Sequence, residues 1–150
     1  MREGEGVAIA FQVTFDSADP AALAAFWAEA LRYVPQPPPE GFDSWDAAYE
    51  AEGASVEEPT SWAALVDPAG VGPRVYFQRV PESKTAKNRV HLDLRAAADA
   101  APGERNPTLE RERERLEALG ARLTNRLEPD GVNDLCLVMQ DPEGNEFCLD

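Results

Sequence analysis

An internal repeat constrains the fold of this chain more than any other feature, because the same order of elements occurs twice. An alternating apolar run over Val7–Phe15 precedes a helix start at Asp19-Pro20, and a similar run over Val90–Leu94 precedes a second start at Asn106-Pro107. Alternation with a period of two is typical of a half-buried strand, and an Asx residue followed by proline is a helix N-terminus signal. Each half then ends with short apolar runs and a D-P-x-G turn before the last run.

The repeat predicts an α+β fold made of two βαβββ modules within a single domain over residues 1–150. Module one covers about 7–80, a linker covers about 81–87, and module two covers about 88–150. Two such modules side by side predict a cupped, eight-stranded mixed sheet with its helices on the outer face. The other expected elements are helices over about 20–32 and 106–119 and strands over about 45–51, 62–66, 74–80, 121–127, 135–140 and 145–149.

Strand periodicity also predicts which side chains face the cup, since positions i and i+2 share one face of a strand. The apolar set expected to pack under the helices is Phe11, Val13, Phe15, Val90, Leu92 and Leu94. The polar set expected to line the cup is Gln12, Thr14, Tyr76, Gln78, His91, Asp93, Glu146 and Cys148. A polar lining where a core would be apolar favours a ligand cavity.

Charge and residue counts exclude several classes of function. Fourteen basic residues against 28 acidic ones give a formal charge of −14, which disfavours phosphate backbones and anionic membranes as partners. No signal peptide or membrane-spanning run is visible, so we expect a cytoplasmic protein, and its two cysteines are expected to be reduced thiols. A single histidine excludes metal sites that need two or more histidines from one chain.

Two motifs carry a resemblance to a known family. The paired modules, R-V-H-L-D-L at Arg89–Leu94 and D-P-E-G-N-E-F-C-L at Asp141–Leu149, resemble the vicinal oxygen chelate superfamily over about residues 7–150. That superfamily includes glyoxalase I, bleomycin-resistance proteins and extradiol dioxygenases, and the chain is most similar to a glyoxalase-like branch of actinobacterial type. The resemblance implies a small organic molecule as partner and a homodimer, while a shared fold leaves the activity open.

The resemblance also implies where a metal would bind. The family's four ligand positions fall here on Gln12, Gln78, His91 and Cys148. Gln12 and His91 match residue types of the glyoxalase I site, whereas Gln78 and Cys148 stand where glutamates supply the remaining ligands and the base. Two amides, an imidazole and a thiol are a poor set for a hard divalent ion. We therefore expect no metal and no other cofactor at this site, with a divalent metal as the less favoured alternative.

The polar residues allow three classes of function. The first is a small-molecule-binding protein whose ligand contacts Gln12, Thr14, Trp45, Trp62, Tyr76, Gln78 and Cys148. The second is a lyase or isomerase of glyoxalase type, which uses either an atypical metal site or His91 as acid–base group with Asp93 and Glu146 assisting. The third is a structural or regulatory module.

Two details stay open, namely whether the thiols of Cys136 and Cys148 are neighbours, and whether Lys84 binds an anionic ligand or forms ion pairs at the module junction.

Overall fold

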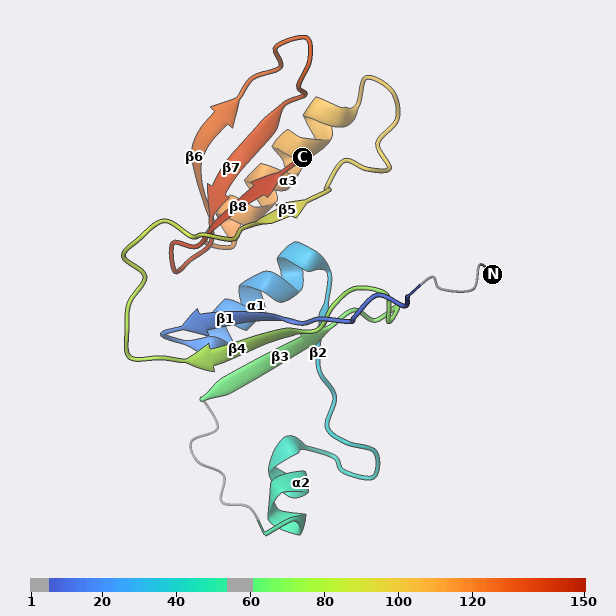
Figure 1. Cartoon of the computed structure of the whole chain (residues 1–150), viewed down its shortest axis with the longest axis vertical. Coiled ribbons are helices and arrows are strands. Elements are labelled where there is room, and N and C mark those ends of the chain that lie inside the picture. The colour runs from blue at the N-terminus through green and yellow to red at the C-terminus, as the bar shows by residue number, and fades with distance from the viewer. Residues whose placement is uncertain (1–5, 54–60) are drawn as a thin grey trace.

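The computed structural model describes residues 6–53 and 61–150, which form three helices and eight strands (Figure 1). The first half contains β1 (Val13–Ser17), α1 (Pro20–Leu31), β2 (Val34–Pro35), α2 (Trp45–Ala51), β3 (Trp62–Val66) and β4 (Val75–Arg79). The second half contains β5 (Leu92–Leu94), α3 (Arg105–Ala118), β6 (Arg122–Leu127), β7 (Cys136–Gln140) and β8 (Glu146–Leu149).

The strands form two four-stranded mixed sheets with the same internal order. The first sheet has the order β1-β4-β3-β2, and the second has the order β5-β8-β7-β6. In each sheet the strand that begins the module in sequence, β1 or β5, pairs in parallel with the strand that ends it, β4 or β8. The other neighbouring strands are antiparallel. The predicted α+β fold of two βαβββ modules is confirmed. Among the described residues no strand pair joins the two sheets, so the eight strands form two hydrogen-bonded units (Figure 1).

The core lies on the helix-covered side of both sheets. Leu23 and Trp27 of α1 are buried together with Phe77 of β4 and Phe147 of β8. The rings of Trp27 and Phe147 lie edge to face with their centroids 5.1 Å apart, which joins the two modules through apolar contact. Helices α1 and α3 also meet, because Arg115 Nη2 donates to a carbonyl oxygen of α1 at 2.9 Å. The two helices therefore contact each other at the junction of the modules.

Hydrogen bonds of Asp141 and Glu143, in the D-P-E-G turn, reinforce the contact between the modules; we call this group of contacts the polar latch. Asp141 is only 3% exposed, and its carboxylate accepts from Trp27 Nε1 at 3.0 Å. Glu143 accepts from Ser17 Oγ at 2.6 Å and from the backbone N–H of Ala18 at 2.7 Å, immediately before α1. A carboxylate is favoured at this place because the first N–H groups of a helix lack partners within the helix.

The first helix is built as its sequence predicts. The Asp19 side chain accepts from the backbone N–H of Ala22 at 3.2 Å, Pro20 occupies the first turn, and the helix ends at Arg32, whose φ is 56°. Helix α3 differs in detail, since it starts at Arg105 after Glu104 without a side-chain cap. Asn106 therefore lies inside the first turn rather than capping it.

Three expectations for the first half and the edges of the sheets are wrong. Residues 45–51 form helix α2 instead of a strand, because Ser44 caps a helix by accepting from Ala47 N at 3.0 Å. Strand β1 begins at Val13, six residues after the apolar alternation starts at Val7, and β5 begins at Leu92, two residues after the alternation starts at Val90. Phe11 and Val90 consequently lie outside the ladders and are 71% and 79% exposed, whereas the other four members of the predicted apolar set pack against the core.

Candidate functional site

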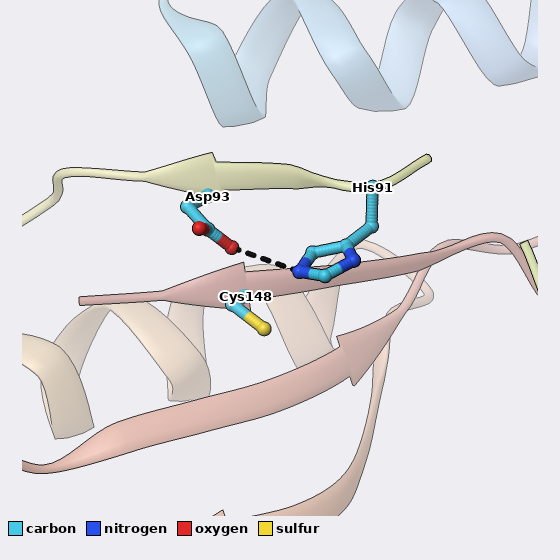
Figure 2. A group of neighbouring side chains, drawn as sticks. All are labelled: His91, Asp93 and Cys148. Atoms are coloured by element: carbon cyan, nitrogen blue, oxygen red, sulfur yellow. Dashed lines mark ion pairs between the residues drawn. The ribbon is translucent and has the colours of Figure 1, made fainter. Parts of the chain in front are cut away.

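Three of the predicted site residues meet on the polar face of the second sheet (Figure 2). Asp93 lies in β5 and His91 directly precedes that strand. Cys148 lies directly opposite Asp93 in the parallel β5–β8 ladder. His91 Nε2 lies 3.1 Å from Asp93 Oδ1. One nitrogen, oxygen or sulfur atom from each of the three side chains lies within 4.8 Å of the others. The structure thus brings together an imidazole, a carboxylate and a thiol.

The three groups differ in exposure and in proton affinity. The side chains of His91 and Asp93 are 40% and 42% exposed, whereas Cys148 is buried. Burial, and after it the neighbouring Cys136 and Asp93, together raise the pKa of the Cys148 thiol to about 12. In the absence of a bound cation Cys148 is therefore a neutral thiol and a poor nucleophile. Its hydrogen bond to Cys136 also shows that the two thiols are neighbours on adjacent strands.

Glu146 holds the linker between the modules. Its carboxylate accepts from the backbone N–H of Asn88 at 3.1 Å and pairs with Lys84 Nζ at 3.2 Å. Burial raises the pKa of Glu146, but the Asn88 N–H and the Lys84 ammonium outweigh that effect and hold the pKa below its ordinary value. Lys84 thus forms an ion pair at the module junction, which was one of the two roles that the sequence left open for it.

The module-one positions are engaged with their own sheet. Gln12 Oε1 accepts from Arg74 Nη1 at 3.0 Å, while Gln12 Nε2 donates to Thr14 Oγ1 at 3.2 Å. Gln78 Nε2 donates to Asp16 Oδ1 at 2.8 Å. Both amides therefore have partners within module one. The four family positions also offer only one group able to carry a negative charge, the thiol of Cys148, so this set does not fit a hard divalent ion.

An aromatic row lies on the same polar face of the first sheet. Trp62 stacks on Tyr76 with ring centroids 5.9 Å apart, and Trp45 meets Trp62 edge to face at 5.2 Å. Arg74 covers Tyr76 from above, 5.1 Å from the ring centroid. Sequence analysis missed Arg74, although it precedes Tyr76 by two positions and therefore shares its face.

A cavity of about 580 Å³ lies between the facing edges of the two modules. Thr14 and Asp16 of β1 line one wall, and His91 lines the other together with Lys84 and Glu146. Asn88 also lines the cavity, and its Oδ1 atom is buried without a hydrogen-bond partner among the described residues. Asp16 and Asn88 were missed by sequence analysis. Asn88 carried a signal, since it directly precedes the R-V-H-L-D-L motif.

The fold and this site can now be compared with known proteins. The glyoxalase-like domain family matches residues 12–149, so the chain belongs to that family. No protein with a curated function matches the sequence. In the part of the chain that the structure describes, no helix is both long and apolar enough to cross a membrane. The assignment to an actinobacterial branch stays a prediction.

Solved structures support the same fold. A glyoxalase/bleomycin resistance protein/dioxygenase family enzyme from Burkholderia phytofirmans is 15% identical, with a TM-score of 0.58 and coverage of 92% of this chain and 94% of that chain. The fosfomycin resistance protein FosX from Listeria monocytogenes, solved as a mutant with Mn(II) and 1S,2S-dihydroxypropylphosphonic acid, is 12% identical, with a TM-score of 0.61 and coverage of 96% and 90%. FosX from Mesorhizobium loti is 12% identical, with a TM-score of 0.58 and coverage of 97% and 90%. At these identities the similarity shows a shared vicinal oxygen chelate fold, and the activity has to be argued from the site.

Proposed function

We propose that this protein binds a small organic molecule between its two modules, against His91. The observation that carries this proposal is the cavity of about 580 Å³ whose walls come from both modules. Ligand pockets commonly measure about 300–1,000 Å³ and contain a few convergent polar groups. Here the convergent groups are the hydroxyl of Thr14, the imidazole of His91 and the amide of Asn88, whose buried oxygen has no partner among the described residues.

The proposed binding mode does not use the metal arrangement that the family resemblance implies. The module-one amides are occupied by Arg74, Thr14 and Asp16, and they are neutral ligands. A ligand would therefore be held by hydrogen bonds from the protein itself. For the same reason the proposed binding mode includes no counterpart of the Mn(II) in the Listeria protein.

Thermal stabilisation by a panel of metabolites and antibiotics tests the proposal. A ligand at about one hundred times its Kd adds roughly 2.7 kcal/mol to the free energy of unfolding, which raises Tm by several degrees. We expect at least one compound to do so, and we expect His91→Ala to weaken its binding by about tenfold or more without changing the unliganded Tm by a similar amount. Arg111→Ala on the exposed surface of α3 is the matched control. Binding that is equally strong in the His91 variant would refute this placement of the ligand.

A second candidate function is favoured by the His91–Asp93 pair. A carboxylate 3.1 Å from one ring nitrogen orients the imidazole, and a histidine can transfer protons near neutral pH without a metal. The candidate is a lyase or isomerase of glyoxalase type with His91 as acid–base group. Product analysis separates it from simple binding, since the compound is either converted or recovered unchanged. Loss of conversion in His91→Ala with retained binding would favour the enzyme.

We also propose that the chain acts as a homodimer. Val7, Ile9 and Phe11 alternate along the segment before β1 and are all exposed, as is Val90 before β5. An apolar alternation at the end of two edge strands is an unfavourable surface for a monomer in water. Light scattering coupled to size exclusion should give twice the chain mass, and a double substitution of Ile9 and Phe11 by serine should shift it toward the monomer. A wild-type monomer at micromolar concentration would contradict the proposal.

A further inference from the structure

We propose that Arg74, Tyr76 and Trp62 form a binding site for a small aromatic carboxylate on the polar face of the first sheet. The site lies within module one, and none of these three side chains lines the cavity between the modules. It therefore goes beyond the proposed function, and either site exists without the other. The four ligand positions that the family resemblance implies include none of the three residues.

The guanidinium of Arg74 is half-buried and has only neutral partners. Its Nε donates to Gln36 Oε1 at 2.7 Å, its Nη1 donates to Gln12 Oε1 at 3.0 Å, and its central carbon lies 5.1 Å from the ring centroid of Tyr76. Among the residues that the structure describes, no carboxylate forms an ion pair with Arg74, and Nη2 has no acceptor. A guanidinium is a permanent cation with five donors, so Arg74 keeps both a charge and donors for an anion.

The rings beside Arg74 supply a surface for the aromatic part of the ligand. The ring planes of Trp62 and Tyr76 are 15° apart and their centroids are 5.9 Å apart, so the two faces are nearly parallel. Both side chains are half-buried, which leaves part of each ring accessible. Aromatic rings pair in offset stacks, and a third ring extends such a stack. A ligand ring on this pair lies within reach of Arg74, because the guanidinium contacts the Tyr76 ring.

Gln36 holds the two parts of the site together. Its backbone N–H donates to the carbonyl of Ala64 in β3 at 2.9 Å, and its own carbonyl accepts from Trp45 Nε1 at 3.0 Å. Its side chain accepts from Arg74, while Trp45 meets Trp62 edge to face at 5.2 Å. Groups that are already fixed lose less freedom when a ligand binds. The guanidinium and the rings are thus held in place before any ligand arrives.

These groups select the chemical class of the ligand. A carboxylate forms charge-assisted hydrogen bonds with a guanidinium, and its two oxygens match the planar fork of the donors, whereas a neutral carbonyl forms weaker bonds and an ammonium is repelled. An aliphatic carboxylate gains nothing from stacking. The formal charge of −14 opposes anions at long range, but charges beyond about 8 Å are screened at physiological ionic strength, so the contact with Arg74 decides.

The experiment uses 1-naphthoate as the probe and isothermal titration calorimetry of the full chain as the assay. We expect one naphthoate to bind per chain. 1-Naphthamide keeps the ring without the charge, and cyclohexanecarboxylate keeps the charge without the aromatic ring. Each should bind about tenfold more weakly than naphthoate or worse. A naphthoate Kd above about 1 mM, or equal affinity for either of the other two compounds, would overturn the proposal.

Three variants test where the probe binds. Arg74→Gln removes the charge but keeps a hydrogen-bonding side chain, and it should lower naphthoate affinity by about tenfold and abolish the preference over naphthamide. Trp62→Leu should weaken naphthoate while leaving the affinity for cyclohexanecarboxylate unchanged. Arg111→Ala removes the same charge from the exposed surface of α3 and should change neither affinity.

Circular dichroism and the Tm of each variant confirm that it is folded before binding is compared. Naphthoate that binds Arg74→Gln as strongly as wild type would refute the placement of the carboxylate, and unchanged binding in Trp62→Leu would refute the placement of the ring. None of these measurements depends on a ligand for the cavity between the modules.

Discussion

The indole of Trp27 is expected to contribute to stability in two separable ways. Its ring is 1% exposed within the core, and its N–H donates to the carboxylate of Asp141, which is itself buried. Trp27→Phe removes part of the ring, at a cost of about 1–2 kcal/mol, and leaves a buried charged acceptor with one donor fewer, at a further cost of about 1.5–3 kcal/mol. We expect the free energy of unfolding to fall by about 2.5–5 kcal/mol and Tm to fall by roughly 5–20 °C.

The assay is urea unfolding followed by circular dichroism, with two comparison proteins. Phe26→Leu is the matched control, because Phe26 is a buried aromatic side chain on the same helix without a polar atom, and it should cost about 1.5 kcal/mol. Replacing residue 27 with benzothienylalanine keeps the shape of the indole and removes its N–H, and should cost about 1.5–3 kcal/mol by itself. If the benzothienyl variant is as stable as wild type, the bond between Trp27 and Asp141 does not stabilise the module contact and the reasoning is refuted.

Three further predictions concern other turns of the structure. Glu143→Gln replaces a charge-assisted acceptor at the start of α1 and should lower the free energy of unfolding by about 1–2 kcal/mol in urea titrations, whereas an unchanged midpoint would contradict this account of the latch. Gly72→Ala places a Cβ 2.1 Å from the hydroxyl oxygen of Tyr33 and should cost about 1–3 kcal/mol, and Tyr33→Phe in the same chain should restore most of the lost Tm unless the clash is relieved in another way. Backbone N–H donation from Asn133, with further hydrogen bonds, lowers the pKa of Asp130 from 3.8 to about 2, so its contribution to stability is present above about pH 4 and is lost as the pH falls toward 2. The difference in unfolding free energy between wild type and Asp130→Asn should therefore shrink over that range of pH, and a constant difference would show that Asp130 does not titrate as its contacts predict.

Local signals in the sequence predicted most of the fold. Asp19-Pro20 predicted α1 because a capping side chain and a fixed proline φ act within one turn, and the D-P-x-G turns predicted the last hairpin of each module for the same reason. The errors occur where tertiary context decides. The apolar alternation continues through Phe11 and Val90, but neither has a paired strand beside it, so strands β1 and β5 start later. In α2, Trp45 and Tyr49 have β-propensity, yet the Ser44 cap favours a helix.

The candidate site was predictable only in part. Strand periodicity placed His91, Asp93 and Cys148 on one face, because the side chains of a strand alternate. Their proximity depends on the register of β5 against β8, which pairs Asp93 with Cys148 and which no residue pattern specifies. Strand periodicity also could not predict the contacts of Glu146 with the linker. These contacts join segments that are far apart in the sequence, and they depend on the path of residues 84–88.

The separation of the strands into two sheets has a consequence for how such a chain can diversify. In the described part of the chain, strands β1–β4 pair only with one another, and strands β5–β8 pair only with one another. The two modules meet through the aromatic and carboxylate contacts on the helix side, whereas the opposing edges border the cavity. Substitutions along those edges therefore change the shape and chemistry of the cavity without removing a backbone hydrogen bond. New binding specificities are accessible to this architecture at little cost in folding, provided that the contact between Trp27 and Asp141 is kept.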